Sequence, residues 1–182
     1  MQNRKANIII GSSGGTASKK SKTYKISLPT EWVRELGITD SERQVRISFD
    51  GEKIIIEKCR SAEEFIRHKI SMGHDIKKLE YYDKDTLCTV IAADFRDKTL
   101  AFENYVDDNI KTAFGKNENP DWTDFENFLA DRCVPKSRAG IQHYIDALGI
   151  AEYEPIEIIK KTHGKMAEDS QWLNICEVGH EN

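Results

Sequence analysis

The clearest pattern of apolar and polar positions lies in residues 25–58. Tyr24–Leu28 has the composition of a strand, and Pro29 ends it because proline cannot donate to a strand ladder. A short helix is predicted next, and Gly37 suits the position just past its last turn. Two more strands are predicted after it.

Side chains alternate along the first of these strands, where Val45, Ile47 and Phe49 share one face and polar residues take the other. This period of two is typical of a half-buried strand. Asp50-Gly51 is a strong hairpin signal, and Lys53–Lys58 is the predicted return strand. Domains below about 40 residues usually need disulfides, metal or a second chain to bury a core. Because no disulfide pattern is present, we expect this region to be half of an intertwined dimer.

The middle of the chain predicts a helix and a second hairpin. Ser61–Ile70 has helical composition, with Glu64 at the capping-box position. The charged segment Gly73–Asp85 is interpreted as a boundary between domains. Strands are then predicted over Thr86–Ala93 and Thr99–Tyr105, joined by a short turn.

Beyond residue 120 the apolar period becomes helical, and three helices are predicted. The first contains Trp122–Leu129, and the others span Ser137–Leu148 and Pro155–Thr162. The expected fold class is therefore α+β. Its predicted parts are residues 1–60, a helix and linker over 61–85, and a third part over 86–182.

The two parts of the chain differ in the sign of their net charge. Residues 1–60 carry 12 lysines and arginines against 7 acidic residues, a balance of +5. Residues 61–182 carry 15 against 24, a balance of −9. A basic module joined to an acidic one indicates two surfaces with different partners, although an unevenly charged surface without partners is the alternative.

The composition predicts a cytoplasmic protein with reduced thiols. The four cysteines are far apart and form no CxxC pair. No signal peptide and no apolar run of membrane-spanning length is visible, so no membrane partner is expected.

No motif in the chain predicts catalysis, a cofactor or a metal. The glycine-rich segment before Lys19 lacks the Gly-Lys-Ser/Thr of a P-loop, and a strand rather than a helix follows it. The five histidines form neither HExxH nor a zinc-finger spacing. Acidic residues such as Asp94 and Glu103 fit solvated charge better than a nuclease site. We therefore expect a protein that acts by binding.

Three phrases in the first third of the chain carry a family resemblance. They are Lys25-Ile-Ser-Leu-Pro, Glu31-x-x-Arg-x-Leu-Gly-Ile and Asp50-Gly-x-Lys-Ile-Ile-Ile-Glu-Lys, in that order. With them, residues 1–60 resemble the AbrB and MazE family of swapped-hairpin DNA-binding domains. The resemblance implies a dimeric β-barrel made when two chains interleave their hairpins, here followed by a β-hairpin and three-helix module.

The same resemblance implies that basic residues on one side of the barrel approach double-stranded DNA. By position, Lys25 and Arg34 match DNA-facing residues of the family, and lysines of the preceding loop extend that set. Arg43 and Arg46 fit either further phosphate contacts or a solvated strand face. The expected DNA-binding residues are Lys19, Lys20, Lys22, Lys25, Arg34, Arg43 and Arg46.

The acidic remainder is interpreted as a partner-binding module. Its phrases Arg132-Cys-Val-Pro-x-x-Arg and Lys161-Thr-His-Gly-x-Met-Ala-Glu-Asp-x-x-Trp resemble a module of proteins from clostridial phages and mobile elements. Tyr153, Met166 and Trp172 are candidate anchors for a partner, since such side chains are enriched at interface centres. Packing in the core is the alternative for all three.

The whole chain resembles the type II-A anti-CRISPR proteins, which inhibit Cas9. That resemblance implies stoichiometric binding to the nuclease, with DNA binding near the complex or at the inhibitor's own promoter. The alternative is an autoregulatory antitoxin, with a toxin as its protein partner, or an AbrB-type transcriptional repressor. With each of these functions, we expect this chain to form a homodimer that binds double-stranded DNA.

Overall fold

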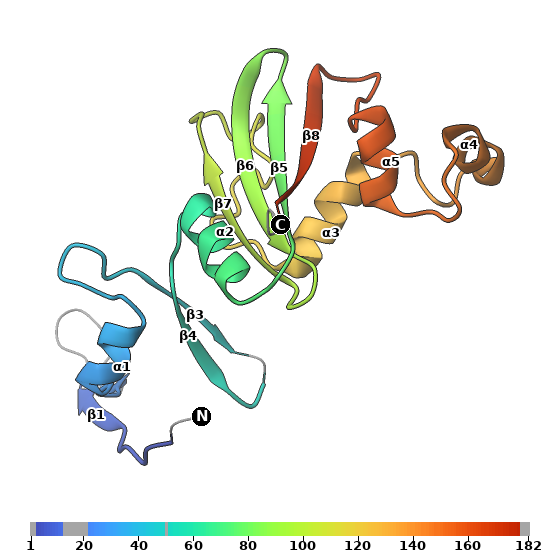
Figure 1. Ribbon diagram of the computed structural model, residues 1–182. Coiled ribbons are helices and arrows are strands. Elements are labelled where there is room, and N and C mark those ends of the chain that lie inside the picture. The colour runs from blue at the N-terminus through green and yellow to red at the C-terminus, as the bar shows by residue number, and fades with distance from the viewer. Residues whose placement is uncertain (1–2, 13–21, 50, 179–182) are drawn as a thin grey trace. The chain divides into compact units, whose positions relative to one another are not determined.

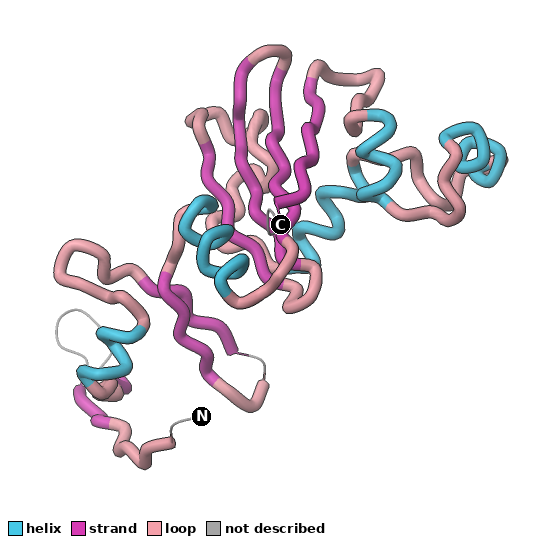
Figure 2. The backbone as a smooth tube through the Cα atoms, viewed as in Figure 1, coloured by secondary structure: helices cyan, strands magenta, loops and turns pink. Residues whose placement is uncertain are grey.

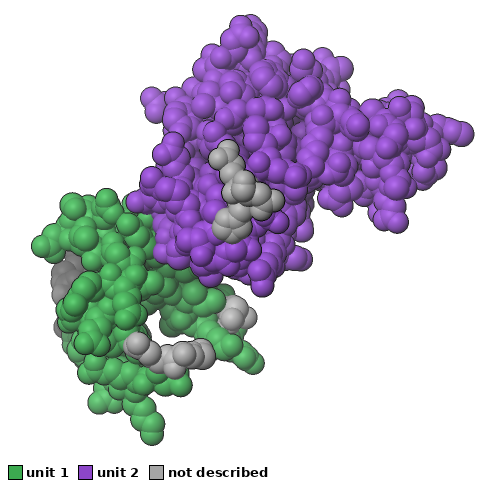
Figure 3. All heavy atoms as spheres, in the orientation of Figure 1, with its two compact units in different colours: residues 1–59 green, residues 60–182 purple. Residues whose placement is uncertain are grey.

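The computed structural model describes residues 3–12, 22–49 and 51–178. The chain forms two compact units, residues 1–59 (unit 1) and residues 60–182 (unit 2) (Figure 3). Helices and strands are mixed in an α+β arrangement (Figure 2). The described residues contain five helices and antiparallel sheets of two, two and four strands, none of which closes into a barrel.

Unit 1 consists of two small hairpins and one short helix (Figure 1). Its elements are β1 (Ile9–Ser12), β2 (Lys22–Lys25), α1 (Thr30–Glu35), β3 (Val45–Phe49) and β4 (Ile54–Lys58). β1 pairs with β2 and β3 pairs with β4, both antiparallel.

The helix and the second hairpin of unit 1 confirm the predicted element order. α1 begins directly after Pro29, and Gly37 has the left-handed φ of +69° that terminates it. The first predicted strand, Tyr24–Leu28, is displaced along the chain, because β2 begins at Lys22 and ends at Lys25. Its ladder stops there since Lys25 pairs with Ile9, the first residue of β1.

Unit 2 is built on a four-stranded antiparallel sheet in the order β7-β6-β5-β8. Its elements are α2 (Ala62–Ser71), β5 (Ile76–Asp83), β6 (Thr86–Asp94), β7 (Thr99–Asn104), α3 (Trp122–Asp131), α4 (Ile141–Leu148), α5 (Pro155–Thr162) and β8 (Gln171–Val178). The capping box predicted for α2 is confirmed, with Ser61 and Glu64 exchanging hydrogen bonds. The hairpin β6–β7 and the three later helices are confirmed as well.

The sheet of unit 2 has apolar side chains on both faces. On one face, Leu79 and Ile91 pack with Phe125 of α3 and Ile159 of α5 in the main core. The other face carries a smaller cluster, to which α2 contributes Ala62, Phe65, Ile66 and Ile70. Strand alternation makes this division, because successive side chains point to opposite faces.

The predicted linker before residue 86 is wrong. Residues 76–83 form β5, which lies inside the sheet and pairs with both β6 and β8. The strand was missed because Lys77, Lys78 and Glu80 make its composition charged. Its buried residues are Ile76, Leu79 and Tyr81. The strand β8 was not predicted either, so the module is more than a hairpin with three helices.

Among the described residues, no helix is both long enough and apolar enough to cross a lipid bilayer.

Candidate functional site

The basic side chains expected to contact DNA are only partly described by the structure. Lys19 and Lys20 fall outside the described residues. The side chains of Lys22 and Lys25 on β2, Arg34 on α1 and Arg43 before β3 are exposed, and that of Arg46 on β3 is half-buried.

One copy of unit 1 does not gather these cations on a single strand face. Lys22 and Lys25 are three residues apart on β2, so their side chains point to opposite sides of the hairpin. Arg46 is paired in register with Glu57 of β4, which places a carboxylate beside it on the same face. The exposure of these residues suits phosphate contact, but their grouping would have to come from a larger assembly.

The hairpin β3–β4 has one face made almost entirely of apolar side chains. Register and alternation place Val45, Ile47, Phe49, Ile54 and Ile56 on that face. Three of them are strongly exposed, with fractions of 66% for Ile47, 69% for Phe49 and 70% for Ile54.

The first hairpin shows the same exposure of apolar groups. Ile9, Ile10 and Tyr24 are each more than half exposed. No described residue of unit 1, in the ranges 3–12, 22–49 and 51–59, is buried. Unit 1 therefore has backbone pairing without a core of its own. Burying Ile47, Phe49 and Ile54 alone would contribute on the order of 3–6 kcal/mol per chain.

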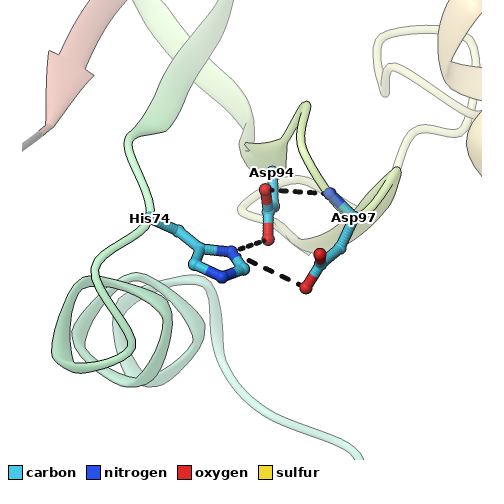
Figure 4. Close-up of side chains that lie close together, drawn as sticks. All are labelled: His74, Asp94 and Asp97. Carbon is cyan, nitrogen blue, oxygen red and sulfur yellow. Dashed lines mark hydrogen bonds and ion pairs between the residues drawn. The ribbon is translucent and has the colours of Figure 1, made fainter.

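In unit 2 a buried ion network joins α2 to the β6–β7 turn (Figure 4). Asp94, at the end of β6, is fully buried, and its Oδ2 lies 2.7 Å from both Lys69 Nζ and His74 Nδ1. Its Oδ1 accepts hydrogen bonds from the backbone N–H groups of Arg96 and Asp97. Lys69 also pairs with the Asp97 carboxylate at 2.7 Å.

His74, Asp94 and Asp97 bring ligand-type atoms within 4.8 Å of one another, as a metal site would. The Lys69 ammonium, however, contacts both carboxylates and supplies the positive charge that a metal ion would bring. A metal bound there would have to displace this ammonium. We therefore interpret the cluster as structural, because it holds α2 to the β6–β7 turn. The prediction that Asp94 is a solvated charge is wrong, because its side chain is buried and paired. Sequence reasoning missed the cluster because its four residues are spread over positions 69–97.

Opposing effects set the pKa of Asp94. Burial acts to raise the pKa, but hydrogen bonds from Lys69, from His74 and from the Asp97 backbone outweigh burial and lower the pKa to about 2. An unfolded aspartate has a pKa near 3.9, so the folded state stabilises the ionised form of Asp94 relative to the protonated form.

A second buried network contains Arg132 and Gly164, which belong to the two sequence stretches noted above, beginning at Arg132 and at Lys161. The Arg132 guanidinium is buried, pairs with both Asp169 carboxylate oxygens at 2.6 and 3.1 Å, and donates to the carbonyls of Gly164 and Gln171. Gly164 has a φ of +58°, and a Cβ there would lie 3.2 Å from Arg132 Cβ. These residues hold the α5–β8 connection against the end of α3.

The three predicted partner anchors are at least half-buried. The Tyr153 hydroxyl donates to the Val134 carbonyl at 2.9 Å, and its ring packs against the main core. The Trp172 ring stacks on Tyr82, with centroids 4.5 Å apart, and its Nε1 donates to the Lys84 carbonyl. Met166 is half-buried in the α5–β8 connection. Of the three, Trp172 lies on the sheet surface opposite the main core, since β8 places it in register with Tyr82.

No protein-family model, curated protein or solved structure matches this chain.

Replacing Asp94 with asparagine should lower the free energy of unfolding at pH 7 by about 3 kcal/mol, because Lys69 would lose its buried counter-charge. The sign follows from the lowered pKa: the stabilisation is present above pH 4 and is lost as pH falls toward 2. Urea unfolding from pH 7 to pH 2 should therefore show the gap between wild type and Asp94→Asn closing. Glu168→Gln, at an exposed carboxylate of the α5–β8 connection, is the control and should change little. A gap that stays constant with pH would contradict this.

Proposed function

We propose that this protein is a dimeric DNA-binding protein that inhibits a bacterial defence nuclease, Cas9, by stoichiometric binding in the cytoplasm. The observation that carries the DNA-binding half is the state of unit 1, which combines exposed basic side chains with two hairpins whose apolar side chains enclose no core. The same DNA binding would let the protein repress its own promoter. The nuclease target rests on the resemblance of the whole chain.

A second copy of the chain is the partner that best completes unit 1. An isolated two-stranded hairpin is at best marginally stable in water, so each hairpin needs further strands to pack against. Two copies supply two β1–β2 hairpins and two β3–β4 hairpins, and interleaving them would cover the β3–β4 apolar face. Dimerisation would also bring the basic side chains of two copies of unit 1 into one assembly.

The dimer is tested by Ile47→Glu, which puts a charge on the apolar face of β3. Wild type should sediment as a dimer and Ile47→Glu as a monomer, because a buried unpaired carboxylate costs several kcal/mol. Ser48→Glu is the matched control, since it adds the same charge to the opposite face of the same strand and should remain dimeric. A wild-type monomer with intact hairpins would refute the interleaved arrangement.

DNA binding is tested by replacing Lys22 and Lys25 together with alanine. Each lost phosphate contact should reduce the slope of log affinity against log salt by about 0.9. Duplex titrations at several salt concentrations should therefore show weaker binding and a flatter slope. The control replaces Lys116 and Lys161, two exposed lysines of unit 2, and should leave the slope unchanged. Equal slopes for wild type and the Lys22/Lys25 variant would exclude these contacts.

The negative charge and the folded core of unit 2 support a role in nuclease inhibition. Residues 60–182 carry 16 basic and 24 acidic residues, a balance of −8. Cas9 holds nucleic acid in a positively charged channel, to which an acidic module is attracted. Unit 2 also has a folded core, whereas a short disordered tail would favour an antitoxin.

The role is tested by target-DNA cleavage with a Cas9–guide complex and increasing amounts of the protein. Cleavage should be lost near a stoichiometric ratio of this protein to Cas9. The loss should persist when the target DNA is concentrated enough to saturate unit 1. Full cleavage despite clear DNA binding would overturn nuclease inhibition and leave the repressor or antitoxin.

A further inference from the structure

Among the described residues of unit 2, 60–178, one face of the sheet is covered at only one end. The helical residues packed on this face come from α2, which buries Ile76, Ala92 and Ala101 beneath it. Figure 1 shows α2 across one end of the sheet and no other helix on that face. Beyond α2, Tyr105 is 55% exposed, and Tyr82, Leu87 and Trp172 are half-buried.

Strand register sorts the uncovered side chains into two rows. One row is apolar and aromatic, with Trp172, Tyr82 and Leu87 in register on adjacent strands. Tyr105 extends this row, because its N–H donates to the Cys88 carbonyl just past the end of β7. The neighbouring row is polar and acidic at its half-buried positions, Asn174, Glu80 and Glu103, and the buried Val90 lies between Glu80 and Glu103.

Contacts within the face hold these groups in fixed positions. The Tyr82 and Trp172 rings are nearly parallel, at 9°. The Tyr82 hydroxyl and the Asn174 amide both donate to Glu80 Oε2, at 3.2 and 3.1 Å. The Tyr105 hydroxyl donates to Glu103 Oε2 at 3.0 Å. Groups fixed before binding lose little conformational entropy when a partner arrives.

The face carries the carboxylates of Glu80 and Glu103 and the ammonium of Lys78, and Lys165 Nζ lies 6.0 Å from the centroid of the Trp172 ring. Lys78 Nζ bonds Glu80 Oε1 at 2.7 Å, and this bond with the one from Asn174 holds the pKa of Glu80 below its usual range. Glu103 receives a backbone N–H from Ala62 and the Tyr105 hydroxyl, with no cation bonded to it among the described contacts. Carboxylates next to aromatic rings suit arginine, which forms charge-assisted hydrogen bonds and stacks on ring faces.

We propose that this half-open face, formed by Tyr82, Trp172, Leu87, Tyr105, Glu80 and Glu103, binds a segment of a protein partner in which basic and apolar side chains alternate. The apolar side chains lie along the aromatic row, and the basic ones meet the carboxylates. Nucleic acid is disfavoured here, because its phosphates would face two carboxylates on a unit of charge −8. The inference deepens the proposed function, since it rests on unit 2 binding a basic protein and names the surface.

The test uses the ¹⁵N-labelled full-length protein and a synthetic peptide of alternating arginine and leucine. Backbone amide shifts should change in β5, β8 and around Tyr105, and a peptide of alternating glutamate and leucine should produce no change. Tyr105→Ala should weaken binding about five- to tenfold, as the loss of an aromatic anchor does. Ile110→Ala, at an apolar residue of unit 2 that is 87% exposed, is the matched control and should bind like wild type.

Shifts confined to α4 or α5, equal shifts with the glutamate peptide, or unchanged affinity of Tyr105→Ala would overturn this surface. Shifts of the same amides with duplex DNA would overturn the choice of a basic protein segment. Peptide binding without inhibition of Cas9 would overturn the proposed nuclease role while leaving the surface in place. Inhibition of Cas9 that Tyr105→Ala leaves intact would preserve the role and reject the surface.

Discussion

Burial of apolar side chains is the constraint on which both units depend, and they meet it differently. Unit 2 has enough chain to cover both faces of its sheet in part and encloses Phe125, Ile158 and Leu173 completely. Unit 1 has only two hairpins and a six-residue helix, and its apolar residues remain exposed. A protein chain rarely leaves such a surface in water. The proposed dimer follows from this difference.

The strand β5 organises unit 2. Its ladder to β6 is a local hairpin, whereas its ladder to β8 joins positions such as Lys77 and Glu177, which are 100 residues apart. Its alternating residues separate the main core from the α2 side. The two buried networks then fix the chain where regular structure ends. Asp94 holds the β6–β7 turn to α2, and Arg132 holds the α5–β8 connection to α3. Each ionic group in them is paired, which is the condition for placing charge inside a protein.

The proposed function assigns opposite charges to separate tasks. Exposed lysines and arginines on unit 1 suit a polyanion, and the carboxylates on the open face of unit 2 suit a polycation. In one chain of net charge −4, this division directs the two units to surfaces of opposite charge. An inhibitor of a nucleic-acid-bound enzyme would use both properties, since its target presents DNA and a basic protein surface together.

Local sequence determined the elements whose signals are contiguous. The capping box of α2, the glycine after α1 and the alternation of β3 predicted their elements because each depends on residues within a few positions of one another. The expected DNA-contacting residues could be named from a family pattern, but strand geometry separates Lys22 from Lys25 and pairs Arg46 with Glu57. Tertiary structure alone revealed that the charged segment 76–83 is a central strand, that Lys69, His74 and Asp94 meet, and that Tyr82 stacks on Trp172. These contacts join residues distant in sequence, and a pattern of local periods carries no information about which distant segments pair.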